Sequence, residues 1–412
     1  MTDTDESWSY APPGTLLGAI ERGRGLGYAH ALAERGAGAA AVLDCLRRDT
    51  RWDWVVDERA GYHACLVREL GLPLAPLPEQ LDGPDEDGSE RAREVLAELA
   101  LLGSAPARTA LRRYVRDGEW WQEVLAVLVR RWPRPWWDDL GPDAVRRLAG
   151  APPLYWRDEP WRRVWRELLP ARERPPRASH RLRIAPRTDR LLAVLADPGS
   201  ARDERSGALY ALAERPAVPP GLLALVPELS APAPAGPGEF ALPGVHRAVH
   251  RLGPLAVEPA RAWAADGPDW LRWLGATVLA EHGGTRDLPL LVAELARQEA
   301  AGEWCGPMAL ADGLARFGPA AGAAVPLLRR LWRRTPHSYE RPSYLRALDA
   351  IDPGAAVPLL VESLWDCEPD ARQHAVRRAP GGGRLADRLA ELRDSPLESA
   401  ELRADAARRL AG

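Results

Sequence analysis

The sequence predicts an all-α protein built from stacked pairs of antiparallel helices. At four places a polar turn residue is followed six positions later by an arginine, and mostly apolar or small residues then stand at +3, +4 and +7. Those three positions lie on one stripe of an α-helix. The last three arginines are 69 and 31 residues apart, and a weaker unit around Cys305 divides the longer interval into 33 and 36. Repeats of this length are typical of stacked helical arrays. The four pairs are Asp53 with Arg59, Asp266 with Arg272, Thr335 with Arg341, and Asp366 with Arg372.

We call these the turn residues and the anchor arginines. A carboxylate at a helix N-terminus meets backbone N–H groups that have no partner inside the helix, and a nearby arginine can neutralise its charge. We therefore expect the four anchor arginines to occupy equivalent places on the second helices of their pairs.

The helical pattern extends along most of the chain. In the N-terminal part, helices are expected at 15–20, 39–48 and 54–70, with a turn at 51–53, and then at 89–102 after a polar loop at 82–87. Further on, the expected pairs are 188–195 with 204–212, 255–265 with 269–281, 287–299 with 303–317, 320–333 with 338–351, 355–364 with 370–378, and 384–392 with 399–410.

The breaks in this pattern suggest four segments within one elongated domain. Residues 1–13 are acidic and end in Ala-Pro-Pro, which predicts a disordered tail, and 14–104 hold the N-terminal helix pairs. Residues 105–187 form an irregular, Pro-interrupted helical segment, and 188–412 hold regular pairs that end in a charged capping unit. A flexible loop is expected at 230–238, because its many Pro and Gly residues cannot hold a helix.

This organisation resembles that of HEAT-repeat proteins. The resemblance covers about 190–410 well, 38–75 reasonably and 105–187 poorly. It implies a right-handed α-solenoid of HEAT-like helix pairs, in which each unit buries its apolar stripes against its neighbours. The chain also resembles uncharacterised HEAT-repeat proteins of actinomycetes.

The amino-acid composition is strongly biased, and this bias limits what the arginine content indicates about function. All 55 basic residues are arginine, and the chain contains no lysine and no asparagine. Residues with A/T-rich codons are scarce, so the arginine content indicates a high-GC bacterial source more than nucleic-acid binding. The net charge of −3 argues against a surface that binds polyanions throughout.

Cysteines and apolar runs indicate a cytoplasmic protein. Cys45, Cys65, Cys305 and Cys367 contain no close pair, which predicts a reduced chain of buried thiols. No apolar run approaches the roughly 20 residues of a membrane span, so no membrane association is expected.

Tryptophan is the strongest departure from a plain scaffold. Eight of the 17 Trp residues lie between 120 and 165, and 105–187 contains 19 Arg against 10 acidic residues. Some of these indoles fit a packing role, since Trp121 and Trp132 share a helical stripe and Trp161 and Trp165 form an i,i+4 pair. Trp136 and Trp137 follow two prolines and precede two carboxylates, a context that favours an exposed binding surface. The expected partner-binding residues are Trp136, Trp137, Arg134, Arg146, Arg147 and Trp156.

The expected function is that of a non-catalytic scaffold that binds a protein partner through its concave face and this Trp/Arg-rich segment. One alternative comes from the resemblance: some bacterial alkylpurine DNA glycosylases are built from HEAT-like repeats and hold the lesion with Trp and Asp. Trp136, Trp137 and Asp138, with Arg146 and Arg147, could play such roles. The other alternative is a HEAT-type lyase or chaperone that acts on a client protein.

No catalytic residue, cofactor or metal site is predicted. His246 and His250 stand at i,i+4 and could present two nitrogens to one metal, but no third ligand is apparent. The chain has no G-x-S-x-G, no P-loop and no dinucleotide fingerprint, and the glycines at 381–383 are expected to form a turn between repeats.

Overall fold

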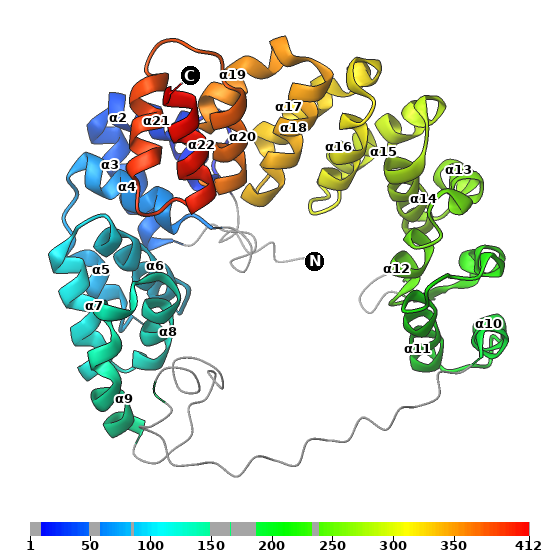
Figure 1. Ribbon diagram of the computed structural model, residues 1–412, viewed down its shortest axis with the longest axis horizontal. Helices are drawn as coiled ribbons and strands as arrows, with labels where there is room; N and C mark the ends of the chain where they lie inside the picture. The colour runs from blue at the N-terminus through cyan, green and yellow to red at the C-terminus, as the bar shows by residue number, and fades with distance from the viewer. Residues whose placement is uncertain are drawn as a thin grey trace, which may run out of the picture. The chain divides into compact units, whose positions relative to one another are not determined.

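The protein is helical throughout the part of the chain that the computed structural model describes, residues 10–48, 58–83, 86–148, 165, 187–232 and 239–411. Figure 1 shows short helices that follow one another along the chain, and the regular β-structure within these ranges consists of two three-residue strands. The all-α prediction is therefore confirmed. Residues 1–9 of the expected tail and the turn at 51–53 lie outside the described residues. Tyr10 and Ala11 are not part of a disordered tail, because the Tyr10 hydroxyl donates to the Pro336 carbonyl at 3.2 Å and the Ala11 N–H donates to the Glu21 carboxylate at 2.6 Å.

The chain divides into two compact units. Unit 1 comprises 1–175, 333–342 and 357–412, and unit 2 comprises 176–332 and 343–356. This grouping differs from the linear division inferred from sequence, because the N-terminal and C-terminal helices belong to the same unit. Three helices, α17 (Val325–Arg334), α18 (Arg341–Ile351) and α19 (Pro353–Ser363), contribute residues to both units.

Unit 1 contains helices from both ends of the chain. Its N-terminal helices pack mainly on their neighbours in sequence, as α4 does on α6 and α6 on α7, and the C-terminal helices α21 and α22 form a close pair. The helices are α1 (Leu16–Glu21), α2 (Gly25–Ala33), α3 (Arg35–Arg47), α4 (Ala60–Leu70), α5 (Pro76–Gln80), α6 (Glu86–Leu101), α7 (Ala105–Asp117), α8 (Trp121–Arg131), α9 (Gly141–Leu148), α20 (Pro369–Arg378), α21 (Leu385–Asp394) and α22 (Ala400–Ala411).

The two ends of the chain meet where α1 turns into α2. The backbone N–H of Cys367 donates to the carbonyl of Gly23 at 2.8 Å, and Arg24 forms a bidentate ion pair with Glu362 at 2.9 and 3.1 Å. Two glycines permit this approach. Gly23 has φ +66°, and a Cβ on Gly25 would lie 1.9 Å from the carbonyl oxygen of Glu362. The close backbone contact therefore requires glycine at both positions.

Unit 2 is built from helix pairs and one β-hairpin. Helices α13 and α14 make the closest pair, and a Cβ on Gly275 would lie 2.6 Å from the carbonyl oxygen of Ala260, so glycine permits the helices to touch. Strands β1 (Ser230–Pro232) and β2 (Glu239–Ala241) pair antiparallel, with Ala231 opposite Phe240. The helices are α10 (Thr188–Ala196), α11 (Arg202–Ala213), α12 (Val245–His250), α13 (Val257–Asp266), α14 (Asp269–His282), α15 (Leu288–Ala301) and α16 (Pro307–Ala315).

Three local expectations need correction. Residues 105–131 form two regular helices, α7 and α8, where an irregular pattern was expected, because Ser104 caps α7 and Pro106 lies in its first turn, where proline is tolerated. The predicted loop at 230–238 begins with strand β1, and its remainder lies outside the described residues. The helix expected at 303–317 starts only at Pro307, since Cys305 has φ +72° and so cannot continue a helix.

Candidate functional site

The anchor arginines lie at the N-terminal ends of helices. Arg272 and Arg372 are the fourth residues of α14 and α20, and Arg341 follows a 3-10 turn at Ser338–Glu340 as the first residue of α18. Arg59 directly precedes α4. Arg272 and Arg372, however, pair with carboxylates other than those of their turn residues.

Arg341 and Arg372 each form a bidentate ion pair with a carboxylate that lies 25 or 26 residues further along the chain. Arg341 binds Asp366 through two hydrogen bonds, and Arg372 binds Glu398 in the same bidentate way with both distances at 2.8 Å. Arg372 also donates to the main-chain carbonyls of Asp366 and Cys367. Asp366 thus joins two anchor arginines, one through its side chain and one through its carbonyl, and this series stiffens the C-terminal part of unit 1.

Arg59 and Arg272 make other contacts. Arg272 lies 3.8 Å from Glu294 and donates to the Gly267 carbonyl at 3.3 Å. Arg59 is buried and donates to the Glu21 carbonyl and, at 2.8 Å, to the Pro336 carbonyl, so it links α1 to the 333–342 segment of unit 1. The turn residue Asp53 lies outside the described residues.

Trp137 is a packing residue, which makes the expectation of an exposed indole wrong for this position. Its side chain is 4% exposed, and its indole N–H donates to the carbonyl of Trp132 at 3.2 Å. Its ring meets that of Trp165 edge to face, with centroids 5.8 Å apart. The two prolines before it place the chain in a short 3-10 turn that directs this indole inward.

Trp136 is half-buried, so it too is not exposed as expected. Its ring meets Trp132 edge to face at 5.7 Å, and the Arg108 guanidinium lies 4.8 Å from its centroid. An indole enclosed between another indole and an arginine stabilises α7 and α8. The third expected tryptophan, Trp156, lies outside the described residues.

The polar residues around this pair also make local contacts. Arg134 lies 3.2 Å from Asp138, which accepts a hydrogen bond from the Trp165 indole at 3.1 Å. Arg146 pairs with Asp143. Arg147 donates to the carbonyls of Val115 and Gly118, at 3.1 and 2.6 Å. Arg147 thus links α9 to the C-terminal end of α7, whereas Arg134 and Arg146 pair within their own segments.

A large groove lies elsewhere in unit 1, with a volume of about 940 Å³. Helix α4 lines it through Gly61, Cys65 and neighbouring residues, and a Cβ on Gly61 would just contact the Leu397 side chain at 3.6 Å. One wall comes from α6 and the C-terminal end of α8, and the other from 365–372 and 384–399. Both ends of the chain therefore build this groove.

The groove is charged at its walls and carries apolar and aromatic side chains between them. Nine carboxylates and six arginines line it, so its net charge is negative. Glu90, Glu94 and Glu98 follow one another at i,i+4 along α6, and the deepest of them, Glu98, pairs with Arg131 of α8. Burial raises the pKa of Glu98 above its ordinary value, although Arg131 opposes this effect.

The two thiols that line the groove are poor nucleophiles. Burial raises the pKa of Cys65, and it raises the pKa of Cys367 to about 12 even though the guanidinium of Arg341 acts in the opposite direction. A nucleophilic cysteine needs a lowered pKa. These thiols therefore serve as small packing groups, as the sequence suggested.

The sequence does not predict the groove, although it shows the acidic stripe of Glu90, Glu94 and Glu98 along α6. The stripe alone indicates a solvated helix face, and only the folding of the C-terminal helices onto α4 converts it into a wall.

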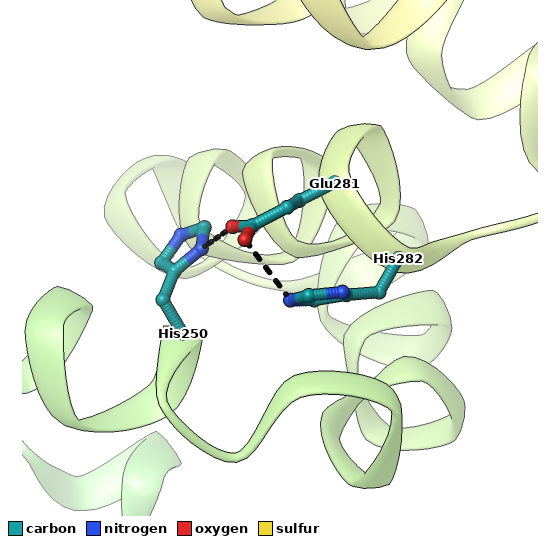
Figure 2. A group of neighbouring side chains, drawn as sticks. All are labelled: His250, Glu281 and His282. Carbon is teal, nitrogen blue, oxygen red and sulfur yellow. Dashed lines mark hydrogen bonds and ion pairs between the residues drawn. The ribbon is translucent and has the colours of Figure 1, made fainter. Parts of the chain in front are cut away.

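A cluster of two histidines and a glutamate lies in unit 2 (Figure 2). His250 ends α12, and Glu281 and His282 end α14. Glu281 lies between the two imidazoles, with its carboxylate 2.6 Å from His250 Nδ1 and 3.4 Å from His282 Nε2. One donor atom from each residue falls within 4.8 Å of the other two.

The i,i+4 pair of His246 and His250 does not assemble this cluster. His246, one turn before His250, takes no part in it, and burial followed by the charge of His250 lowers the pKa of His246 to about 4. The signal that could have found the cluster is the Glu-His pair that stands 31 and 32 residues after His250, one repeat length further along the chain.

Comparison with protein-family models and with curated proteins gives no match for this chain. Across the described ranges, no helix combines the length and apolar character needed to cross a membrane.

Proposed function

We propose that the protein is a non-catalytic scaffold, a right-handed α-solenoid of HEAT-like helix pairs, that binds a segment of a protein partner in the groove of unit 1. The single observation that carries this proposal is the groove itself, whose volume of about 940 Å³ is within the range of ligand-binding clefts. Its lining combines apolar side chains with charges, as protein interfaces do.

The groove's charge indicates the type of segment. Carboxylates outnumber arginines along its lining, and Glu90 and Glu94 present theirs along one wall. Complementary charge favours a partner segment that carries arginine or lysine, because matched potentials give specificity and speed association. Tyr28, Leu102 and Trp365 supply surfaces for apolar side chains of the same segment.

The Trp/Arg-rich segment takes part through its helix α8 and not through its tryptophan pair. Val127, Arg130 and Arg131 line the groove, whereas the indole of Trp137 is buried within the unit. The buried aromatic residues keep α8 in place, and the end of α8 provides the contact surface.

A random peptide library displayed on phage provides the test, with the purified full-length protein as the target. The peptides that the protein enriches are expected to contain basic and apolar residues. Their affinity is expected to fall at least about tenfold on the variant Glu90→Lys/Glu94→Lys, which reverses the acidic wall.

The matched control is Glu79→Lys/Glu119→Lys, which changes the net charge equally at two exposed positions of unit 1 that do not line the groove. This variant is expected to bind the peptides as the wild type does. Equal binding by the groove variant and the wild type, with both folded by circular dichroism, would contradict the proposed site.

A further inference from the structure

We propose that His250, Glu281 and His282 form a binding site for a zinc ion that links the ends of helices α12 and α14. The site is independent of the groove, because all three residues belong to unit 2. It rests on three observations: the arrangement of the donor atoms, the direction of the hydrogen bonds at His250, and the surroundings of His282.

The donor set and its spacing suit zinc. Imidazole nitrogen and carboxylate oxygen are common zinc ligands, at about 2.0–2.2 Å from the metal, which places donors in a tetrahedral site roughly 3.4 Å apart. Here the carboxylate of Glu281 is 3.4 Å from His282 Nε2 and 2.6 Å from His250 Nδ1. The contact with His282 matches this spacing, rotation of the exposed Glu281 side chain can open the contact with His250, and the three donor atoms all lie within 4.8 Å of one another (Figure 2).

Hydrogen bonding at Thr277 fixes the role of each nitrogen of His250. The Thr277 hydroxyl donates its one proton to the carbonyl of Leu274 at 2.9 Å, so its oxygen accepts from His250 Nε2 at 3.1 Å. Nε2 therefore carries a proton. In the neutral imidazole, Nδ1 then has a lone pair that faces the Glu281 carboxylate at 2.6 Å.

Two lone pairs at that distance repel each other unless a positive charge lies between them. Either a second proton on His250 or a metal ion supplies that charge. The metal also accounts for Thr277, because a metal-bound histidine usually donates its other N–H to a nearby acceptor that fixes the ring's orientation.

His282 gives the independent observation. Its Nε2 atom is shielded from solvent and forms no hydrogen bond, although the Glu281 carboxylate lies 3.4 Å away. A buried polar atom without a partner calls for an explanation, and a bound ion is one. This nitrogen points toward the same carboxylate as His250 Nδ1, so a shared metal satisfies both histidines (Figure 2).

The helix end favours a cation as well. Glu281 and His282 close the 14-residue helix α14, whose C-terminal carbonyls carry partial negative charge. Three protein ligands leave a fourth position for water, and the partial exposure of all three side chains gives the metal a path from solvent.

Zinc binding to the metal-stripped full-length protein tests this inference. Competition with a chromophoric chelator is expected to give one zinc ion per chain, and zinc is expected to raise the temperature at which unit 2 unfolds, because it binds only the folded state. Magnesium is expected to do neither, since it prefers oxygen ligands. Cobalt(II) in place of zinc is expected to give the visible absorption bands of a tetrahedral site.

Single substitutions locate the site. His250→Ala, Glu281→Gln and His282→Ala are each expected to weaken zinc binding at least about tenfold, as loss of one ligand should. His246→Ala is the matched control on the same helix and is expected to bind zinc as the wild type does. If the ligand variants bind zinc as tightly as the control, the ion is held elsewhere and the inference is wrong.

The wild type alone also decides the question if a variant fails to fold. Absence of the cobalt(II) bands, or of one tightly held zinc ion per chain, would overturn the proposal. Neither result bears on peptide binding in the groove of unit 1, so the two proposals can fail separately.

Discussion

Arg341 and Asp366 form a bidentate ion pair with distances of 2.8 and 2.7 Å, and both side chains are completely buried. Asp366 also accepts from the backbone N–H of Glu368, and Arg341 contacts Cys367 Sγ at 3.2 Å. Burial by itself would lower the pKa of Arg341, but Asp366 holds it above its ordinary value. The guanidinium is therefore charged at every pH at which the protein is folded.

Removing one member of this ion pair should destabilise unit 1 far more than removing both. Arg341→Met leaves the Asp366 carboxylate buried without its partner, and we expect a loss of about 3–5 kcal/mol in the stability of unit 1. Arg341→Met/Asp366→Leu should recover much of this loss. Urea unfolding followed by hydrogen exchange in α20 measures both, and a double variant as unstable as the single one would contradict the account.

The glycine at the start of α2 should be irreplaceable. A Cβ on Gly25 would lie 1.9 Å from the Glu362 carbonyl oxygen, so Gly25→Ala forces the two ends of the chain apart. We expect a cost of about 1–3 kcal/mol, as for other overpacked sites. Gly36→Ala in α3 is the control, because a Cβ there meets no atom within 4 Å and should stabilise the helix by roughly 0.5–1 kcal/mol. Thermal unfolding distinguishes the two, and equal effects would show that the chain ends do not meet here.

Two tryptophans of the same segment should behave in opposite ways. Trp137 is 4% exposed and packs in the core of unit 1, so Trp137→Ala is expected to cost about 3–5 kcal/mol. Trp120 is 48% exposed, and Trp120→Ala should change stability by no more than about 0.5 kcal/mol. Denaturant midpoints give the comparison. A small loss of stability on Trp137→Ala would contradict the packing role and make Trp137 a candidate partner contact again.

Unit 2 should lose stability in mild acid because of His246. Its pKa is lowered to about 4 by burial and by the charge of His250, whereas an ordinary histidine has a pKa of 6.5. Between these values the unfolded chain binds a proton that the folded chain does not, so stability falls as pH falls from 6.5 to about 4. The slope of the unfolding free energy against pH reports how many more protons the unfolded chain binds. Replacing His246 by Leu should lower that number by up to one. An unchanged slope would mean that His246 is not responsible.

The sequence predicted the helices of the chain better than their assembly. Apolar stripes at a period of 3.6 residues located α14, α20 and α22 to within two residues, because local periodicity determines them. The positive φ of Cys305 could not be predicted, because such a backbone conformation at a residue other than glycine has no sequence signal. The meeting of Gly23 with Cys367 also could not be predicted, because it depends on contacts between residues more than 300 positions apart.

The candidate sites were predictable to different degrees. Trp136 and Trp137 were recognised as unusual, but proline-flanked tryptophans occur both at surfaces and in cores, and only tertiary packing decided between them. The groove requires both ends of the chain, so no local pattern indicates it. The cluster at His250 and Glu281 requires knowing that residues one repeat apart lie side by side, and this can be read from sequence only after the repeat length is known.

Site-specific photo-crosslinking tests the central claim, that the groove of unit 1 holds a protein partner. A photoreactive amino acid is placed at Leu397 or Leu102, which line the groove, or at the control position Leu255, which is 60% exposed in unit 2. In cells of the organism that encodes the protein, we expect one discrete protein adduct from each groove position and none from the control. The groove peptides selected by phage display should suppress these adducts. Adducts that form equally from Leu255, or that persist in the Glu90→Lys/Glu94→Lys variant, would contradict the claim.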